Sequence, residues 1–166
     1  KFGNGHIYFT GTVFMPNYPL TDFPTTSGAL DNTFNADHLM SDGFVCRINP
    51  AGGGISDLVY STYIGAPATW MGIQQQTMSN GIALSPNNPD VVYVVGQAGG
   101  GFPVTSVSPP YSGGQGDVFV IKLSMDNNNT APDFTDLLAS RYMGGPNQDS
   151  GFDIAVDSDE EVFVTG

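Results

Sequence analysis

The sequence predicts an all-β fold built from repeated four-stranded antiparallel sheets. A strand-like phrase occurs three times, at residues 6–11, 91–96 and 161–166, and each copy ends in glycine. Short runs of β-branched and aromatic residues alternate with clusters of Gly, Pro, Asn and Asp, which is typical of strands separated by turns. No segment keeps a convincing helical period over three turns. A repeat of this length indicates supersecondary units that stack on their neighbours.

The repeated phrase belongs to a longer set of landmarks in a fixed order. The loops between landmarks differ in length: Phe23 comes 12 positions after Gly11, but Phe102 comes only 6 positions after Gly96. Variable loops between constant strands are expected on a fixed scaffold. We therefore predict a single segment over 1–166, with repeat units near 12–96 and 97–166, that forms part of a longer array. The matching segments are 22–26 and 101–105, 43–48 and 118–123, 58–65 and 137–144, and 81–84 and 153–156.

We expect nine strands, which give the order b-c-d, a-b-c-d, a-b. Turn-forming residues at 85–90 and 157–160 would join strands a and b as tight hairpins. The only helix candidate is residues 69–78, and Gly72 argues against it. Four strands joined as a meander make the blade of a β-propeller, so the sequence predicts about two full blades plus flanking strands. The expected strands lie near 6–14, 43–49, 58–64, 81–85, 91–97, 117–123, 137–143, 153–157 and 161–166.

Composition excludes some partners. The 166 residues carry a net charge of −12, with four Lys and Arg in all. This disfavours nucleic acid, because binding phosphates needs a cationic surface, and it disfavours anionic membranes. No apolar run is long enough to span a bilayer, and the sequence does not start with a signal peptide. Cys46 lies in an apolar strand and is expected to be a buried thiol. The shortage of lysine with abundant Asn, Thr, Ser and Gly suggests an extracellular protein.

Several of these landmarks together resemble one known family. Residues 22–26, 42–52, 58–65, 154–157 and 162–166 are similar to the bacterial β-propeller repeat family, called SBBP. The resemblance covers nearly the whole chain apart from its loops. It implies a secreted or cell-surface bacterial protein, and it implies a fold without assigning a reaction, so no catalytic residues follow from it. The chain departs from the family in its longer repeat spacing, its a–b turns and its two full units, which are too few to close a ring.

Acidic loops could bind calcium, a hard cation that takes oxygen ligands. Asp149 and Asp153 lie in the richest acidic stretch, and Asp126 lies in a second loop. Neither loop follows the EF-hand pattern, and carboxylates that cap turn N–H groups explain both loops as well. We expect no other cofactor.

Aromatic residues in the longer loops are less constrained by the fold than those in strands. Trp70 with Gln74 and neighbouring glutamines forms one candidate ligand-binding patch, and Tyr111 is another candidate. Aromatic rings beside amide groups are suited to a sugar or a protein surface. Packing of these rings as loop anchors is the alternative interpretation.

The sequence holds no catalytic constellation. It has no Gly-x-Ser-x-Gly or His-Glu-x-x-His motif, and its glycine-rich pieces lack the Lys-Ser/Thr of a phosphate loop. We therefore predict a non-catalytic structural or adhesive interaction module that contacts protein or glycan surfaces. One alternative is a polysaccharide-active propeller enzyme, which needs paired carboxylates. Another is an extracellular filament subunit whose unpaired strands complete blades of neighbouring subunits.

Overall fold

The computed structural model describes residues 2–3, 5–14, 23–35, 40–66, 69–70, 73–105, 109–126 and 134–166. These residues form an all-β structure, as predicted, with two short 3₁₀ turns, η1 (Gly54–Asp57) and η2 (Phe134–Asp136). Within them, no helix is long and apolar enough to cross a membrane.

Three sheets follow one another along the chain. Sheet I has the order β1-β2-β3-β4, sheet II the order β7-β8-β9-β10, and sheet III contains β11 and β12; all pairings are antiparallel. A further ribbon pairs β5 with β6. The strands are β1 (Phe2–Gly3), β2 (His6–Phe14), β3 (Ser41–Ile48), β4 (Leu58–Ile64), β5 (Thr69–Trp70), β6 (Ile73–Gln74), β7 (Thr77–Leu84), β8 (Val91–Ala98), β9 (Asp117–Ser124), β10 (Leu137–Met143), β11 (Asp153–Val156) and β12 (Val162–Thr165).

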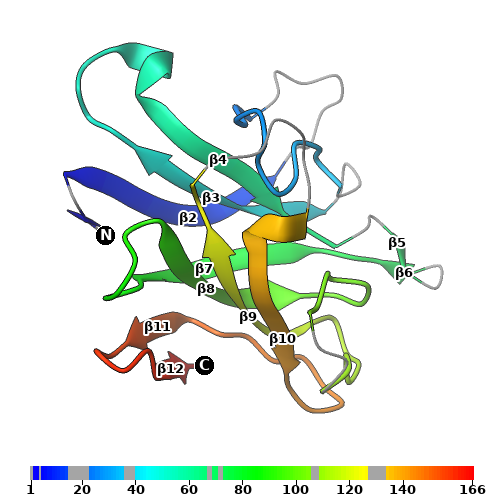
Figure 1. Cartoon of the computed structure of the whole chain (residues 1–166). Coiled ribbons are helices and arrows are strands. Elements are labelled where there is room, and N and C mark those ends of the chain that lie inside the picture. The colour runs from blue at the N-terminus through cyan, green and yellow to red at the C-terminus, as the bar shows by residue number, and fades with distance from the viewer. Residues whose placement is uncertain are drawn as a thin grey trace.

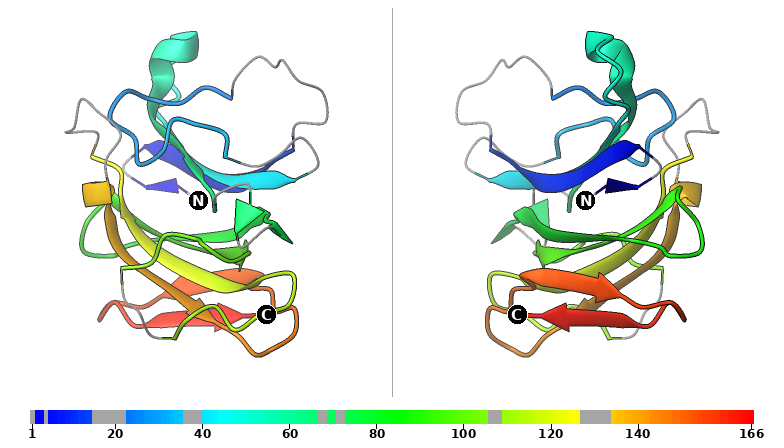
Figure 2. Two further views of the ribbon diagram at one scale, coloured as in Figure 1. Left: turned by 90° about the vertical axis from the view of Figure 1, so that its right-hand side faces the viewer. Right: turned by 90° about the vertical axis from the view of Figure 1, so that its left-hand side faces the viewer.

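The sheets are stacked as layers in chain order (Figures 1 and 2). Sheet II lies between sheets I and III, and the two views of Figure 2 show the three layers edge-on. All nine predicted strands are present, and each full sheet is a meander of consecutive strands. The segment 69–78, the one helix candidate, is not helical in its described residues: it holds β5, β6 and the start of β7, with Gln75 and Gln76 between β6 and β7.

Two apolar clusters hold the layers together. The larger cluster joins sheets I and II, where Tyr8, Val45 and Tyr60 pack with residues such as Val92 and Ile121. The smaller cluster joins sheets II and III through Tyr93, Val95 and Ile154 among others. Burial of apolar area is the dominant favourable term in folding, so each sheet depends on the next for its stability.

The glycine that ends the repeated phrase has a steric role in β2 and β8. Gly11 is paired with Phe44, and Gly96 is paired with Phe119, in the neighbouring c strand. A Cβ atom at Gly11 would lie 2.9 Å from the Phe44 ring, and one at Gly96 would lie 2.8 Å from the Phe119 ring. Each glycine therefore leaves room for the aromatic ring that crosses it.

An ion pair links sheet I to sheet II. Arg47 of β3 pairs with Asp90, which lies in the turn between β7 and β8. Its guanidinium lies over the ring of Tyr8, 5.4 Å from the centroid, and its Nε donates to His6 Nδ1 at 2.7 Å. The Tyr8 hydroxyl donates to the Pro89 carbonyl in the same turn at 2.8 Å. The a–b turn of sheet II thus closes over a cation and an aromatic ring of sheet I.

The same contact links sheet II to sheet III. Lys122 Nζ of β9 donates to Glu160 Oε2 at 2.6 Å, and Glu160 lies in the turn between β11 and β12. Lys122 lies over the ring of Tyr93, 5.2 Å from the centroid, and the Tyr93 hydroxyl also donates to Glu160 at 3.0 Å. Glu160 adopts a left-handed backbone conformation with φ 62°. We refer to this arrangement of c-strand cation, b-strand aromatic and acid of the next sheet as the latch.

The latch predicts acid sensitivity. Hydrogen bonds from Lys122 and from Ser85 lower the pKa of Glu160 from 4.5 to about 2. A depressed carboxyl pKa stabilises the fold above pH 4.5, and this contribution is lost as the pH falls towards 2, because the unfolded chain binds the proton first. Urea unfolding at pH 5 and pH 3 should show a loss of stability that is smaller in Lys122→Met. An equal loss of stability between pH 5 and pH 3 in Lys122→Met would contradict this role of the Lys122–Glu160 contact. The control is Glu161→Gln, which changes an exposed acid next to Glu160.

The lone cysteine is a core residue, as expected. Cys46 is 2% exposed and lies 3.1 Å from Ser61 Oγ. Burial raises the pKa of its thiol to about 11, so the reactive thiolate is scarce at neutral pH.

Candidate functional site

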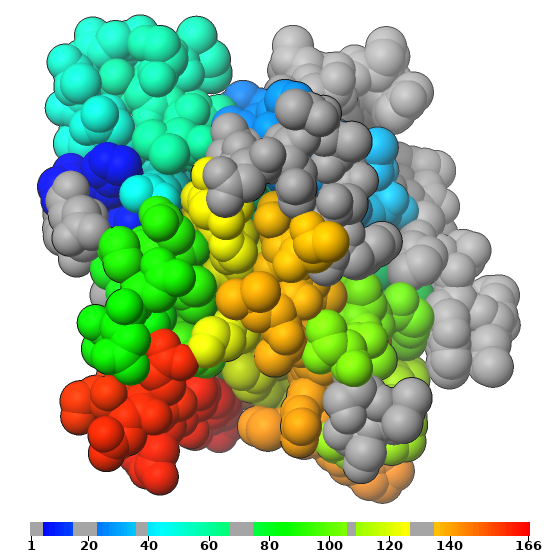
Figure 3. Space-filling view, viewed as in Figure 1, coloured from blue at the N-terminus to red at the C-terminus, as the bar shows by residue number. Residues whose placement is uncertain are grey.

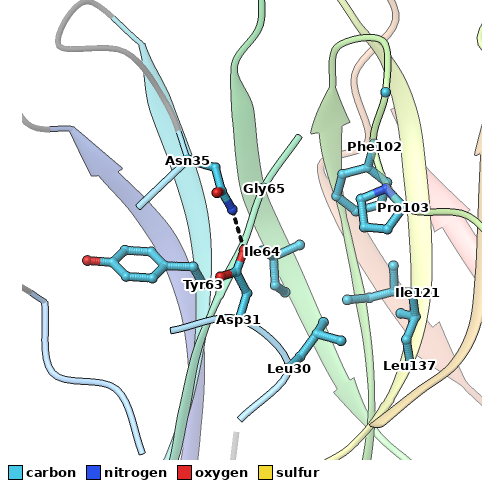
Figure 4. A pocket seen from close by; sticks show the side chains of 11 residues that line it. Leu30, Asp31, Asn35, Tyr63, Ile64, Gly65, Phe102, Pro103, Ile121 and Leu137 are labelled. Carbon is cyan, nitrogen blue, oxygen red and sulfur yellow. Dashed lines mark hydrogen bonds between the residues drawn. The ribbon is translucent and has the colours of Figure 1, made fainter. Parts of the chain in front are cut away.

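A cavity of about 370 Å³ opens between sheets I and II. It lies where the end of β4 faces the loop after β8 and the start of β10. Figure 4 shows the side chains of Leu30, Ile64, Ile121 and Leu137 around one space, with Phe102 and Pro103 on its far side. The walls are apolar because strands of both sheets turn their core-facing residues towards this gap.

Polar groups lie at the rim of this apolar cavity. The Asp31 carboxylate accepts hydrogen bonds from the Thr33 N–H at 2.9 Å, from the Thr33 hydroxyl at 2.7 Å and from the side-chain amide of Asn35. The Asn35 N–H donates to Asp42 Oδ2 at 2.6 Å. The Asp31 N–H donates to Thr62 Oγ1 at 2.8 Å, which ties the loop to β4. The carboxylate and the amide are therefore fixed at the rim before any ligand arrives.

Aromatic rings hold the rim loop in place. The ring of Tyr63 contacts Phe23 and Phe34, with centroids 5.6 and 5.8 Å away. Figure 4 shows that this ring points away from the cavity, although Tyr63 lines it. In sheet II, Tyr142 contacts Phe102 in the same way, at 6.0 Å, and accepts a hydrogen bond from the Phe102 N–H at 2.9 Å. The two sheets thus present their b–c loops to the cavity from opposite sides.

A buried hydrogen bond joins the two sheets below the cavity. The Tyr60 hydroxyl of β4 donates to Asp136 Oδ2 at 2.7 Å, just before β10, and accepts from the Leu30 N–H at 3.1 Å. Burial raises the pKa of Tyr60. The hydrogen bond between Tyr60 and Asp136 therefore fixes the two sheets relative to each other beside the cavity.

This arrangement is suited to binding a ring that has an apolar face and a polar edge. Ligand cavities are typically lined by apolar side chains with a few well-placed polar groups, and 370 Å³ falls within their usual range. Among the described lining residues, Asp31 is the one carboxylate. The acid pair that glycoside cleavage requires is not provided by these residues.

A second polar cluster was missed by the sequence interpretation. Asp117 is fully buried, its Oδ2 accepts the Ser112 N–H at 2.6 Å, and burial raises its pKa. Asp149 accepts the Gly145 N–H at 2.7 Å and adds a repulsive charge to Asp117. Within the described segments, Asp117 Oδ1 and Gln97 Nε2 are buried without a hydrogen-bond partner. These groups lie at the end of sheet II, away from the cavity lining.

The predicted calcium ligands are not brought together. Asp153 is exposed on β11 and accepts its neighbour's Ile154 N–H at 2.9 Å, while Asp149 caps the loop that follows β10. Asp126 is exposed just after β9. No group of three or more metal-ligating His, Cys, Asp or Glu side chains occurs in the described part of the chain. The three aspartates therefore do not form one metal site.

The structure describes the candidate ligand-binding residues Trp70, Gln74 and Tyr111 to different extents. Trp70 and Gln74 lie in the β5–β6 ribbon, but their side chains lie outside the described part of the structure. Tyr111 packs against the core cluster, with its ring 5.5 Å from that of Tyr142, and its hydroxyl donates to the Gly114 carbonyl at 2.9 Å. Tyr111 therefore anchors its loop and is not part of the cavity lining.

The described residues form stacked antiparallel sheets with an apolar cavity between sheets I and II. A scan against protein-family models matches no family to this chain, and no curated protein matches it.

Proposed function

We propose that this chain is a non-catalytic interaction module of a secreted or cell-surface protein built of propeller-type repeats, and that the cavity between sheets I and II is its recognition site. The observation that carries the proposal is the apolar cavity with the Asp31 and Asn35 rim, held between two neighbouring repeats. The bacterial SBBP resemblance and the extracellular composition are in keeping with it.

The latch supports the propeller-type repeat. Sheets I and II, and then sheets II and III, are joined by the same combination of cation, aromatic ring and acid from the next a–b turn. Propeller blades are four-stranded meandering sheets, so a similar contact between successive sheets supports this proposal. An interaction role follows from this architecture because the loops are free to vary while the contacts between sheets are kept.

The proposed ligand is a sugar ring of a glycan or an aromatic side chain on a protein surface. A pyranose ring has C–H groups on its face, which would lie on Leu30, Ile64 and Leu137, and hydroxyl groups on its edge, which would donate to Asp31. The net charge of −12 disfavours polyanionic partners.

The polysaccharide-active enzyme is less favoured than binding. Glycoside cleavage requires an acid and a second carboxylate on opposite sides of the bond. Asp42 is a further acid beside the rim, but it is 1% exposed, lies against Gly65 and accepts the Asn35 N–H. Binding without turnover is therefore the function that this geometry supports best.

A glycan panel tests the proposal. The chain should bind one class of neutral glycan, and Asp31→Asn should weaken that binding about tenfold, because a hydrogen bond to a charged group contributes about 1.5–3 kcal/mol. Leu137→Phe should also weaken binding by filling the cavity, and Asp159→Asn in an exposed turn is the matched control. Thermal unfolding of each variant separates loss of the site from loss of the fold.

New reducing ends in the same panel would contradict the non-catalytic role. Binding that is unchanged in both Asp31→Asn and Leu137→Phe would show that the cavity is not the recognition site.

A further inference from the structure

Two aspartates of sheet II lie around one point beside Gly144. A Cβ atom on Gly144 would lie 2.9 Å from Asp117 Oδ1 and 2.9 Å from Asp149 Oδ2. Asp117 is the first residue of β9, and Asp149 lies in the loop between β10 and β11, where its N–H donates to the Gly116 carbonyl at 2.9 Å. Figure 3 shows the loops before β9 (yellow-green) and after β10 (orange) together at the lower end of the molecule. Two carboxylate oxygens therefore converge on the space that the glycine leaves.

The Asp117 carboxylate is only half satisfied. Its Oδ2 accepts the Ser112 N–H at 2.6 Å, whereas its Oδ1 is buried without a hydrogen-bond partner among the described residues. Asp117 is 0% exposed, so bulk solvent does not reach it. A buried polar atom without a partner is costly, and the like charge of Asp149 adds to that cost. The free Oδ1 therefore points to a ligand that carries positive charge.

Sheet I shows that the fold does not require the second acid. The counterpart of Asp149 there is Thr77, whose Oγ1 accepts the Ala66 N–H at 3.1 Å. In the same way, Asp149 Oδ2 accepts the Gly145 N–H at 2.7 Å. A neutral hydroxyl thus holds the loop in sheet I, so the capping hydrogen bond alone does not explain a carboxylate in sheet II.

The glycine is shared by both sheets, but the pair of acids is not. Gly65 is the counterpart of Gly144, and Asp42 is the counterpart of Asp117. The three atoms nearest to a Cβ atom placed on Gly65 all belong to the Asp42 carboxylate. On Gly144, such an atom would meet the carboxylates of both Asp117 and Asp149. Sheet II therefore has one more negative charge at these equivalent positions.

We propose that Asp117 Oδ1 and the Asp149 carboxylate bind a calcium ion beside Gly144. Calcium takes about six to eight oxygen ligands in a flexible geometry, so two carboxylates can supply the charge while water fills the other positions. No group of three or more His, Cys, Asp or Glu side chains suited to a metal occurs in the described part of the chain. We therefore expect the affinity of an extracellular module, with a Kd of about 0.1–1 mM.

The calcium site goes beyond the proposed recognition role. Neither Asp117 nor Asp149 lines the cavity between sheets I and II. The ion would join the loop before β9 to the loop after β10, and it would offset the repulsion between the two carboxylates. Binding to the folded chain alone stabilises it, so calcium should raise the temperature of unfolding.

Calcium titrated into the chelator-treated full chain tests the proposal. Isothermal titration calorimetry should show a Kd of about 0.1–1 mM. The amide NMR signals of Ser112, Gly145 and Asp149 should shift, and thermal unfolding should occur at a higher temperature in calcium than in chelator. Magnesium should bind more weakly, because it demands near-ideal octahedral geometry and loses its water reluctantly.

Asp149→Thr is the decisive variant, because it copies Thr77 and keeps an acceptor for the Gly145 N–H. It should bind calcium about tenfold more weakly or worse. In chelator it should unfold at the same temperature as the unchanged chain or above it, since the repulsion with Asp117 is gone. Asp153→Asn changes an exposed acid on β11 outside the pair, and this matched control should bind calcium as the unchanged chain does.

Each contrary result would overturn the calcium site. Calcium that changes neither the NMR signals nor the unfolding temperature would do so, as would equal calcium binding in Asp149→Thr. An Asp149→Thr chain that is destabilised equally in chelator and in calcium would show that the carboxylate is a structural cap only. An equal response to magnesium would show unspecific neutralisation of charge. The glycan panel reads the cavity at Asp31, so either result can fail without the other.

Discussion

Replacing Phe119 by alanine should lower the free energy of unfolding by about 3–5 kcal/mol, the usual cost of removing a buried phenylalanine. Phe119 is fully buried in the cluster that joins sheets I and II, and its ring stacks on that of Phe102 with centroids 4.7 Å apart. The lost ring leaves a cavity above Gly96 that the sheet cannot close, because the backbone there is held by strands on both sides. A loss of this size removes much of the stability of a typical domain.

Urea unfolding measured by circular dichroism checks this expectation. The matched control is Phe163→Ala, at the equivalent of Tyr93 in sheet III, where the ring is 56% exposed. That change should stay within about 1 kcal/mol, since surface substitutions have small effects. Similar losses for both variants would mean that the interface between sheets I and II is not the main source of stability.

Replacing Gly96 by alanine should lower the free energy of unfolding by about 2–4 kcal/mol, at the upper end of what overpacking costs. A Cβ atom there would lie 1.9 Å from the backbone carbonyl oxygen of Met78 and 2.8 Å from the Phe119 ring. Both neighbours are fixed: Met78 belongs to β7, and Phe119 is fully buried. The methyl group can therefore be accommodated only if β7 and β8 separate.

Gly11→Ala is the matched control for this prediction. Its Cβ would meet only the ring of Phe44, at 2.9 Å, which is partly exposed and can shift. The loss of stability should be clearly smaller than for Gly96→Ala. An equal loss of stability at both positions would show that the clash with the aromatic ring, and not the clash with the neighbouring backbone, causes the loss.

The strands could be predicted because their residues alternate and repeat. The phrases at 6–11 and 91–96 read alike because β2 and β8 pack their neighbours in the same way, and turn residues at 85–90 mark the hairpin that the structure contains. The short strands β1, β5 and β6 have two residues each, too few to leave a pattern.

The candidate site could not be predicted in the same way. Leu30, Ile121 and Leu137 are ordinary core residues by sequence, and only the relative placement of two sheets makes them walls of one cavity. Asp31 was one acid among several loop acids, with no spacing that set it apart. Asp42 and Asp117 each open a c strand and accept a loop N–H, and this repetition was the one signal for the buried cluster.

The latch gives the stack of sheets a direction. Sheet II offers the acid of Asp90 to sheet I before it and the cation of Lys122 to sheet III after it, so its two faces are chemically different. A contact between unlike faces is heterologous: repeated, it either closes into a ring or grows as an open row. A two-fold symmetric dimer cannot reuse it, since that would bring cation against cation. Any assembly that uses this contact must therefore be polar from end to end.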